Sequence, residues 1–400
     1  MTNQLLENLI VPRFLKYVRV DTQSDRNIEA TPSTEGQREL AKILHDELLL
    51  LGLKDVTITD HCYVIARLPP SPGRENIPCV GFLAHLDTAS DVSGKNVKPQ
   101  IAENAGGGKI IKSDGTTLLG ADDKAGIAEI MAAVEYLVTN SNASLDASEP
   151  YKDTIEHGEV EIIFTPDEET GKGLPEFPLG EIKSVSCYTV DGGAIGEIES
   201  ECFNAVKADI EFTGKVIHVG QARGILANAA LMASTFAAML PRSESPEATD
   251  GYYGYFCPME ISGDLEKAKL EIFLRDFETA GMERRIAALD VFAKTVEAQF
   301  PGGKVIVKTQ AQYYNMKSKI DTQPEVLNKL IQALKNADIE YRLKPVRGGT
   351  DGSRLTELGI PTPNIFTGGR NFHSLMEWVS VDEMCAACRV IIEIIKLQGD

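Results

Sequence analysis

Positive charge is scarce in this 400-residue chain, where 40 Lys and Arg stand against 59 Asp and Glu and the formal net charge is −19. A chain this acidic repels phosphate groups, so we expect neither nucleic acid nor an anionic membrane among its partners. Acidity is most often a feature that favours solubility, and on its own it indicates no function.

Long apolar runs are also missing. The most apolar window, ILANAALMASTFAAML (225–240), is shorter than a membrane span and contains Asn228, Ser234 and Thr235. The opening stretch, MTNQLLENLIVPRFLKYVRV, breaks its apolar positions with Asn, Gln and Glu and has no small-residue cleavage site. It therefore predicts an amphipathic helix and not a signal peptide.

The chain has seven cysteines, an odd number, and they are scattered mostly through apolar segments. Cys385 and Cys388 form the one CxxC, inside MCAACRVIIEIIKL. This stretch is typical of the buried face of a helix, so we expect core cysteines in preference to a structural zinc or redox site. The cysteine pattern favours a reducing compartment, and we expect a cytoplasmic protein.

The length favours two domains, because one hydrophobic core seldom serves 400 residues. Up to about Asp191 the pattern alternates: helices are expected at 35–51 and 124–138, and strands at 63–68, 79–84, 160–164 and 185–190. Residues 204–315 read as three strands and two helices, and helix–strand–helix alternation then resumes. We predict a discontinuous α/β domain (1–204 and 318–400), a mixed sheet with helices on both faces, that carries an inserted α+β domain (205–317).

Histidine is rare too, with six residues. His45, His61 and His157 are expected to be structural or solvated. His85 follows the apolar run CVGFLA, and His373 stands in the Gly-rich NIFTGGRNFH. A sixth, His218, lies in the inserted block.

Carboxylates occupy similar positions. Asp122 and Asp123 follow TLLG and precede a helix, Glu168 and Glu169 follow EIIFTPD, and Asp191 follows SVSCYTV. Ligand sites in open α/β sheets gather beyond the carboxyl ends of the strands, so these side chains should meet at one edge. The run FTPDEETGKG also crowds three acids on one turn, and a nearby cation would offset their repulsion.

Two His and several carboxylates, without Cys, suit zinc or a similar divalent cation. One metal would need fewer ligands than this set offers, whereas two metals that share a carboxylate use all of it. Taken singly, each of these residues would be interpreted as a helix cap, turn acid or solvated charge in preference to a metal ligand. Asp123 is expected to be a helix-starting acid, and Lys124 to be structural.

Six motifs, in order along almost the whole chain, carry a resemblance to a known family. The motifs are AHLDTA, LLGADDKAGIAEIM, FTPDEETGKG, YTVDGG, RGGTDG and NIFTGGRNFH. In these the chain resembles the peptidase T family of tripeptide aminopeptidases, within the wider group of co-catalytic dizinc exopeptidases. The resemblance implies a zinc-dependent hydrolase of short peptides, monomeric or homodimeric, in which the inserted domain is of the lid or dimerisation type.

The resemblance also implies residue roles. His85 and Asp191 would bind one Zn2+, Glu169 and His373 a second, and Asp122 would bridge the pair. Catalytic roles fall to Asp87, which would orient the His85 imidazole, and to Glu168, which would be the general base.

In the inserted domain the resemblance implies an oxyanion role for His218. Asn228, Arg275 and Arg347 are candidates for holding the carboxylate of the peptide; as structural alternatives, either Arg could form an ordinary surface ion pair.

Some positions depart from the family pattern, and substrate preference stays open. Val219 replaces the usual Pro after the lid histidine, Met376 replaces a second His, and the segment before Ser113 is short. The alternatives are a dipeptidase, a carboxypeptidase or an N-acyl amidohydrolase on the same scaffold, or a peptide-binding protein without catalysis. Retention of Glu168 and Asp87 speaks against the last, because a binder needs neither.

Overall fold

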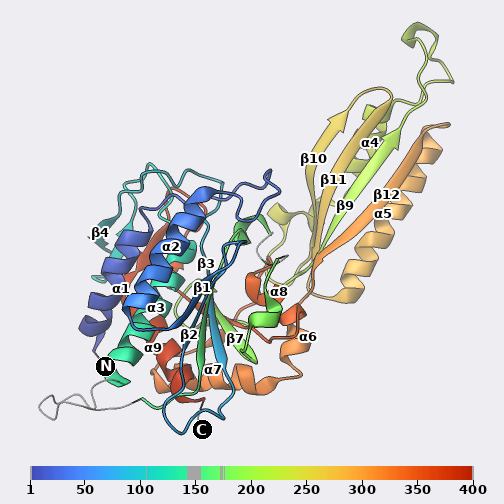
Figure 1. Cartoon of the computed structure of the whole chain (residues 1–400). Coiled ribbons are helices and arrows are strands. Elements are labelled where there is room, and N and C mark those ends of the chain that lie inside the picture. The colour runs from blue at the N-terminus through green and yellow to red at the C-terminus, as the bar shows by residue number, and fades with distance from the viewer. Residues whose placement is uncertain (1, 105, 142–154, 172–173, 175, 399–400) are drawn as a thin grey trace, which may run out of the picture. The chain divides into compact units, whose positions relative to one another are not determined.

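A computed structural model of the chain describes residues 2–104, 106–141, 155–171, 174 and 176–398 (Figure 1). Contacts divide the chain into two compact units. The first consists of Met1–Ser200, Met316–Lys344 and Thr350–Asp400, and the second of Glu201–Asn315 and Pro345–Gly349. Two stretches of chain thus return to the first unit after the second has begun.

An eight-stranded mixed sheet forms the centre of the first unit. In spatial order its strands are β1 (Asp55–Ile58), β2 (Val64–Leu68), β6 (Val160–Thr165), β3 (Val80–His85), β7 (Ser186–Gly192), β14 (Asn364–Phe366), β8 (Glu197–Glu199) and β13 (Arg342–Leu343). The neighbours β6, β3, β7 and β14 are parallel to one another. Their carboxyl ends therefore lie along one edge of the sheet.

Helices cover both faces of this sheet (Figure 1). They are α1 (Asn3–Tyr17), α2 (Glu35–Leu50), α3 (Ala121–Ser141), α6 (Lys317–Ile320), α7 (Pro324–Asn336), α8 (Asp351–Glu357) and α9 (Val381–Lys396). Phe82 and Ile162 join the large core with α1, α3 and α9, whereas their neighbours Leu83 and Ile163 pack with Leu355 of α8 in a smaller one. Alternate side chains of a strand point to opposite faces, so these apolar runs bury both.

A small antiparallel sheet lies beside the central one. Its order is β15 (Gly369–Arg370), β16 (Trp378–Ser380), β5 (Lys109–Lys112) and β4 (Gln100–Glu103). Strands β15 and β16 pair with each other and thereby close the loop that contains His373. This pairing fixes the two ends of the loop that carries His373.

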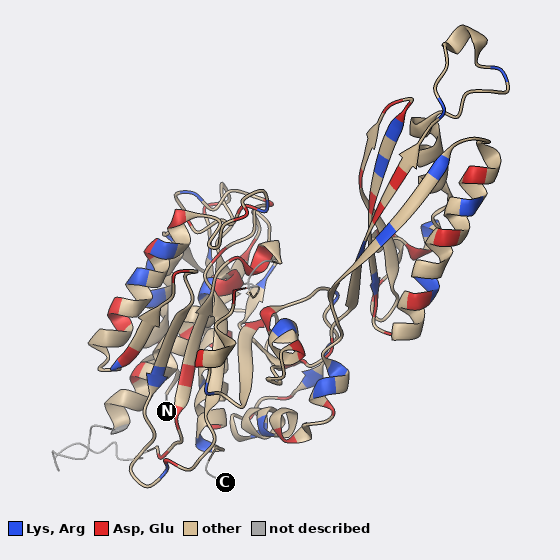
Figure 2. Ribbon diagram, turned by 45° about the vertical axis from the view of Figure 1, so that its right-hand side comes forward, with Lys and Arg blue, Asp and Glu red and all other residues tan. Residues whose placement is uncertain are grey.

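The second unit is a four-stranded antiparallel sheet with two helices on one face (Figure 1). The strands are β10 (Tyr255–Gly263), β11 (Lys267–Asp276), β9 (Asn204–Thr213) and β12 (Lys304–Tyr313), and the helices are α4 (Ala229–Met239) and α5 (Thr279–Gln299). Along β9, Ala208, Ile210 and Phe212 are buried under the helices. Charged residues lie along the outer side of α5 (Figure 2).

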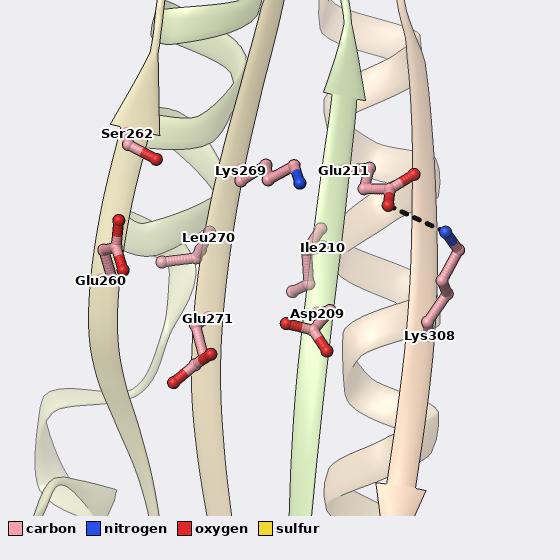
Figure 3. A pocket seen from close by; sticks show the side chains of 9 residues that line it. All are labelled: Asp209, Ile210, Glu211, Glu260, Ser262, Lys269, Leu270, Glu271 and Lys308. Atoms are coloured by element: carbon pink, nitrogen blue, oxygen red, sulfur yellow. Dashed lines mark hydrogen bonds and ion pairs between the residues drawn. The ribbon is translucent and has the colours of Figure 1, made fainter. Parts of the chain in front are cut away.

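The face of this sheet away from the helices is charged (Figure 3). A shallow pocket there is lined by Asp209, Ile210, Glu211, Glu260, Ser262, Lys269, Leu270, Glu271 and Lys308. Lys308 pairs with Glu211 at 2.8 Å, and Lys207 pairs with Glu271 at 2.6 Å. Because this lining contains no His or Cys, and Asp209, Glu211 and Glu271 have lysine partners, it has the character of a solvated sheet face.

The structure confirms the predicted fold class, a mixed sheet with helices on both faces and a separate α+β sheet. The helices expected at 35–51 and 124–138 are α2 and most of α3, and the four strands expected before Asp191 are β2, β3, β6 and β7. Sequence patterns missed the short strands and β10, which places exposed side chains at six successive positions and so shows no alternation there. Cys385 and Cys388 are free and buried on α9.

Close packing of α3 on β7 makes a test of this fold. A Cβ added at Gly126 would lie 1.8 Å from the carbonyl oxygen of Val190, which as backbone cannot move aside cheaply. We therefore expect Gly126→Ala to lower the free energy of unfolding by about 1–3 kcal/mol, the usual cost of overpacking. Thermal unfolding should show a lower midpoint.

The matched control is Gly180→Ala, where an added Cβ would have no neighbour within 4 Å. This variant should unfold at or slightly above the wild-type midpoint. Equal midpoints for the two variants would contradict the close approach of α3 to β7.

Candidate metal centre

The predicted metal-binding side chains all belong to the first unit and stand at the carboxyl edge of its parallel strands. His85 is the last residue of β3, and Asp191 lies near the end of β7. Glu168 and Glu169 open the short 3-10 helix η2 (Glu168–Thr170), which begins three residues after the end of β6. Asp122 lies at the start of α3, and His373 lies in the loop between β15 and β16.

Two groups of side chains form there, and both contain Asp122. In the first, His85 Nε2 lies 2.9 Å from Asp122 Oδ1 and 3.7 Å from Asp191 Oδ1. In the second, His373 Nε2 lies 2.9 Å from Glu169 Oε1 and 3.3 Å from Asp122 Oδ2. Asp122 therefore turns one carboxylate oxygen to each group. The potential ligand atoms of each group all lie within 4.8 Å of one another.

Burial of the carboxylates and the repulsion between them determine the electrostatics of this edge. Burial, together with the negative charge of Asp122, raises the pKa of Asp191 to about 7 and the pKa of Glu169 to about 7. Burial also acts to raise the pKa of Asp122, but hydrogen bonds with His373 and His85 outweigh it and hold that pKa well below its usual value. Hydrogen bonds to Asp122 and Glu169 raise the pKa of His373 to about 11.

This donor set fits divalent cations. Each group offers one imidazole nitrogen and two carboxylates, with no thiolate, as zinc and similar borderline ions prefer. Glu169 Oε1 is buried, and its charged neighbour, His373 Nε2 at 2.9 Å, is itself a candidate metal ligand. Positive charge between the groups would also offset the repulsion that raises the pKa values of Asp191 and Glu169.

Asp87 connects His85 to the acidic turn. Its carboxylate lies 3.3 Å from His85 Nδ1 and accepts the backbone N–H groups of Glu168 at 2.9 Å and Glu169 at 3.2 Å. The side chain is fully buried. Asp87 thus fixes both the imidazole of one group and the backbone that presents the two glutamates.

Asp167 anchors the acidic turn from its other side. The residue adopts a left-handed conformation with φ of 55°, and its buried carboxylate accepts the Ser33 N–H at 2.7 Å and the Gln37 side chain at 2.8 Å. The Gln37 side chain in turn accepts the Asp167 N–H at 3.0 Å. The three consecutive acids therefore differ in place: Asp167 anchors the turn, Glu169 is a candidate metal ligand, and Glu168 belongs to neither group.

Asp123 and Lys124, expected to be structural, are both buried. Asp123 accepts the backbone N–H of His85 at 3.1 Å, and the Lys124 ammonium donates to the carbonyl of Val20 at 2.8 Å. Asp123 thus holds the end of β3 in place and belongs to neither group of candidate ligands.

The sequence of the chain is similar to those of known proteins. Residues 82–397 match the model of peptidase family M20/M25/M40. Peptidase T of Geobacillus sp. strain WCH70 is 44% identical over 418 residues, which cover 98% of this chain and 99% of that protein. Peptidase T of Listeria welshimeri is 43% identical over an alignment that covers 97% of this chain and 98% of that protein. The chain belongs to this peptidase family.

Solved structures share its fold. A crystal structure of aminopeptidase PepT from Bacillus cereus superposes with a TM-score of 0.78 at 23% identity, covering 98% of this chain and 99% of that one. A tripeptidase from Staphylococcus aureus gives 0.81 at 21%, covering 98% of both chains. At such identities these likenesses establish the fold alone. The family assignment makes the chain an enzyme, a metallopeptidase, and the groups around Asp122 are its candidate metal centre.

The remaining predicted site residues of this peptidase lie in the second unit, outside both groups. His218 is exposed, and its Nδ1 accepts the Gly220 N–H at 3.2 Å. The Asn228 side-chain oxygen caps α4 through the Leu231 N–H at 3.2 Å. Arg275 is 8% exposed, with its guanidinium 5.0 Å from the Phe273 ring.

Arg347 already uses its terminal nitrogens inside the second unit. They donate to the carbonyls of Gly251 at 2.9 Å and Tyr253 at 2.8 Å, and to the Thr249 hydroxyl at 2.9 Å. The guanidinium also lies over the Phe203 ring at 5.1 Å. This geometry favours a structural role for Arg347, which holds the 249–253 loop.

Sequence reasoning missed two acids beside the groups. Asp91 lies 3.4 Å from His373 Nδ1, on the side of the ring away from Asp122. Asp351 is buried and accepts the Thr165 hydroxyl at 2.5 Å. Burial raises the pKa of Glu168, and the negative charge of Asp351 adds to that rise. Asp351 lies in RGGTDG, one of the six motifs that carry the family resemblance, and this motif could have pointed to it. No feature of the sequence pointed to Asp91.

Asp167→Asn tests the anchor of the acidic turn. Asn accepts the left-handed backbone, so the change isolates the hydrogen bonds to Ser33 and Gln37. An amide cannot accept all of them, and we expect the free energy of unfolding to fall by about 1–3 kcal/mol, the cost of an unmade buried hydrogen bond. Thermal unfolding measures this loss.

Asp338→Asn is the matched control, because Asp338 has a φ of 57° but an exposed side chain. It should unfold at the wild-type midpoint. If Asp167→Asn did the same, Asp167 would not anchor the turn.

Proposed function

We propose that this peptidase is a cytoplasmic aminopeptidase that removes the N-terminal residue of short peptides, preferably tripeptides, with two zinc ions bound around Asp122. The observation that carries the proposal is that Asp122 turns one carboxylate oxygen to each of two groups. Each group also contains one histidine and one further acid. The relatives named peptidase T and the tripeptidase with the same fold support the tripeptide preference. The seven free cysteines support the compartment.

The residues that would hold the metals follow from the two groups. His85 and Asp191 would bind one ion, Glu169 and His373 the other, and Asp122 both. When bound, the ions would supply Lewis acid chemistry that polarises the scissile carbonyl and makes water easier to deprotonate. Asp87 would orient the His85 ring, as its 3.3 Å contact to Nδ1 supports.

Glu168 is the proposed general base. Its backbone is fixed by Asp87, and its side chain, unlike that of its neighbour Glu169, belongs to neither group of candidate ligands. It would accept a proton from the attacking water and return it to the leaving amine. The position of Glu168, outside both groups, fits a general base better than a further metal ligand.

The second unit is proposed to act as a lid that carries substrate contacts. His218 would stabilise the oxyanion, and Asn228 and Arg275 would hold the carboxylate end of the peptide. Arg347 would support this surface indirectly through the 249–253 loop, since its donors are occupied there. Closure would exclude water from the reacting groups.

Substitution of the two neighbouring glutamates separates their proposed roles. Glu168→Gln should keep the metal content of the wild type and lower kcat by on the order of 10²–10⁴, the share of a general base. Glu169→Gln should instead lose bound zinc, because it removes a charged ligand oxygen. Metal analysis and kinetics on the same preparations measure both. An exchange of these two phenotypes would reverse the assignment.

A substrate panel tests the reaction itself. Free tripeptides should be cleaved faster than dipeptides and tetrapeptides with the same first two residues, and N-acetylation should abolish cleavage, because the proposed enzyme recognises the free amine. Product analysis should find the first residue released. Equal rates on free and acetylated tripeptides would favour an amidohydrolase, and release of the last residue a carboxypeptidase.

A further inference from the structure

Glu377 makes an unusual set of contacts close to the proposed metal centre. The side chain is 1% exposed, and its two oxygens accept four consecutive backbone N–H groups. Oε2 accepts from Leu119 at 2.7 Å and Gly120 at 2.9 Å, and Oε1 accepts from Ala121 at 2.7 Å and Asp122 at 3.1 Å. An ionised carboxylate has about four acceptor sites, so this one is fully used.

The segment that binds this carboxylate is shaped for an anion. Successive backbone N–H groups that converge on one point form a concave anion site, and here the anion is a side chain of the same chain. Gly120 adopts φ of 81°, which a residue with a Cβ rarely accepts. Leu119 and Gly120 precede α3, and Ala121 and Asp122 are its first two residues, whose N–H groups have no helical carbonyl partner.

The backbone of Glu377 belongs to the same loop as His373, between β15 and β16. Within the loop between them, the Ser374 hydroxyl donates to the Asn371 carbonyl at 2.7 Å, and the Glu377 N–H donates to the Ser374 carbonyl at 3.3 Å. Trp378, the next residue, begins β16, which pairs with β5. The loop is therefore braced on itself and on a sheet, and a shift of Glu377 would move His373.

We propose that Glu377 is a positioning residue that fixes the Asp122 backbone relative to His373, so that the Asp122 carboxylate can serve both metal groups. The inference rests on the proposed two-metal function. His373 reaches the Asp122 side chain at 3.3 Å, while four residues later Glu377 binds the Asp122 N–H. These two contacts connect the same two segments, and only the first of them involves a candidate ligand atom.

The test is the zinc affinity of full-length Glu377→Gln, measured by competition with a chromophoric chelator. Glutamine keeps the volume but presents an NH2 group to two of the four N–H donors. We expect the weaker-binding zinc to lose about 10–100-fold in affinity, the usual effect of removing a partner that orients a metal ligand. Wild-type zinc affinity in this variant would overturn the proposal.

Glu161→Gln is the matched control for loss of a buried carboxylate. Glu161 is 0% exposed and accepts the backbone N–H groups of Lys183 at 3.2 Å and Ser184 at 3.1 Å, toward the opposite end of β6 from the acidic turn. This variant should have a lower unfolding midpoint and unchanged zinc affinity. If both variants lost zinc in proportion to their loss of midpoint, Glu377 would be only a structural residue.

Glu377→Asp keeps the test decisive if Glu377→Gln fails to fold. It retains the charge, but its shorter side chain cannot reach all four N–H groups, so the same loss of zinc affinity is expected. Failure of the proposed function would appear separately, as a wild-type protein that binds fewer than two zinc ions. Failure of the inference alone would appear as a wild-type protein with two zinc ions and Glu377 variants that match it.

Discussion

Repulsion between buried carboxylates is the constraint on which the rest of this structure depends. Asp122, Asp191, Glu169 and Glu168 approach one another where parallel strands end, and burial with mutual repulsion raises the pKa values of the last three. A folded chain accepts such an arrangement when a positive charge is bound there, because isolated buried charges are costly. The two histidines supply part of that charge, and divalent cations would supply the remainder.

A second set of acids holds the first set in place. Asp87, Asp123 and Glu377 accept the backbone N–H groups of Glu168, His85 and Asp122, respectively. Asp167 anchors the acidic turn by accepting the N–H of Ser33. Carboxylates do this well because a charged acceptor makes stronger hydrogen bonds than a neutral one. The acidity of the chain around the centre thus has two origins, metal binding and support of the backbone.

Much of this was predictable, and the limits have physical causes. The strand ends that carry His85, Glu169 and Asp191 follow from apolar runs and from the rule that parallel strands finish at one edge. Glu377 could not be found in this way, because its four partners are backbone N–H groups over 250 residues earlier, and backbone donors leave no trace in side-chain patterns. Arg347 was a candidate either for holding the peptide carboxylate or for a surface ion pair, and its contacts to the 249–253 loop could not be read from the sequence.

The central claim is that Asp122 is shared by two cations, and the metal content of the purified protein tests it most directly. After zinc loading and mild dialysis, elemental analysis with protein quantified by amino-acid analysis should give two zinc ions per chain. Asp122→Asn should retain markedly less than one, since its loss weakens both groups. One ion per wild-type chain, or a variant that loses one ion and keeps the other at full occupancy, would contradict the shared carboxylate.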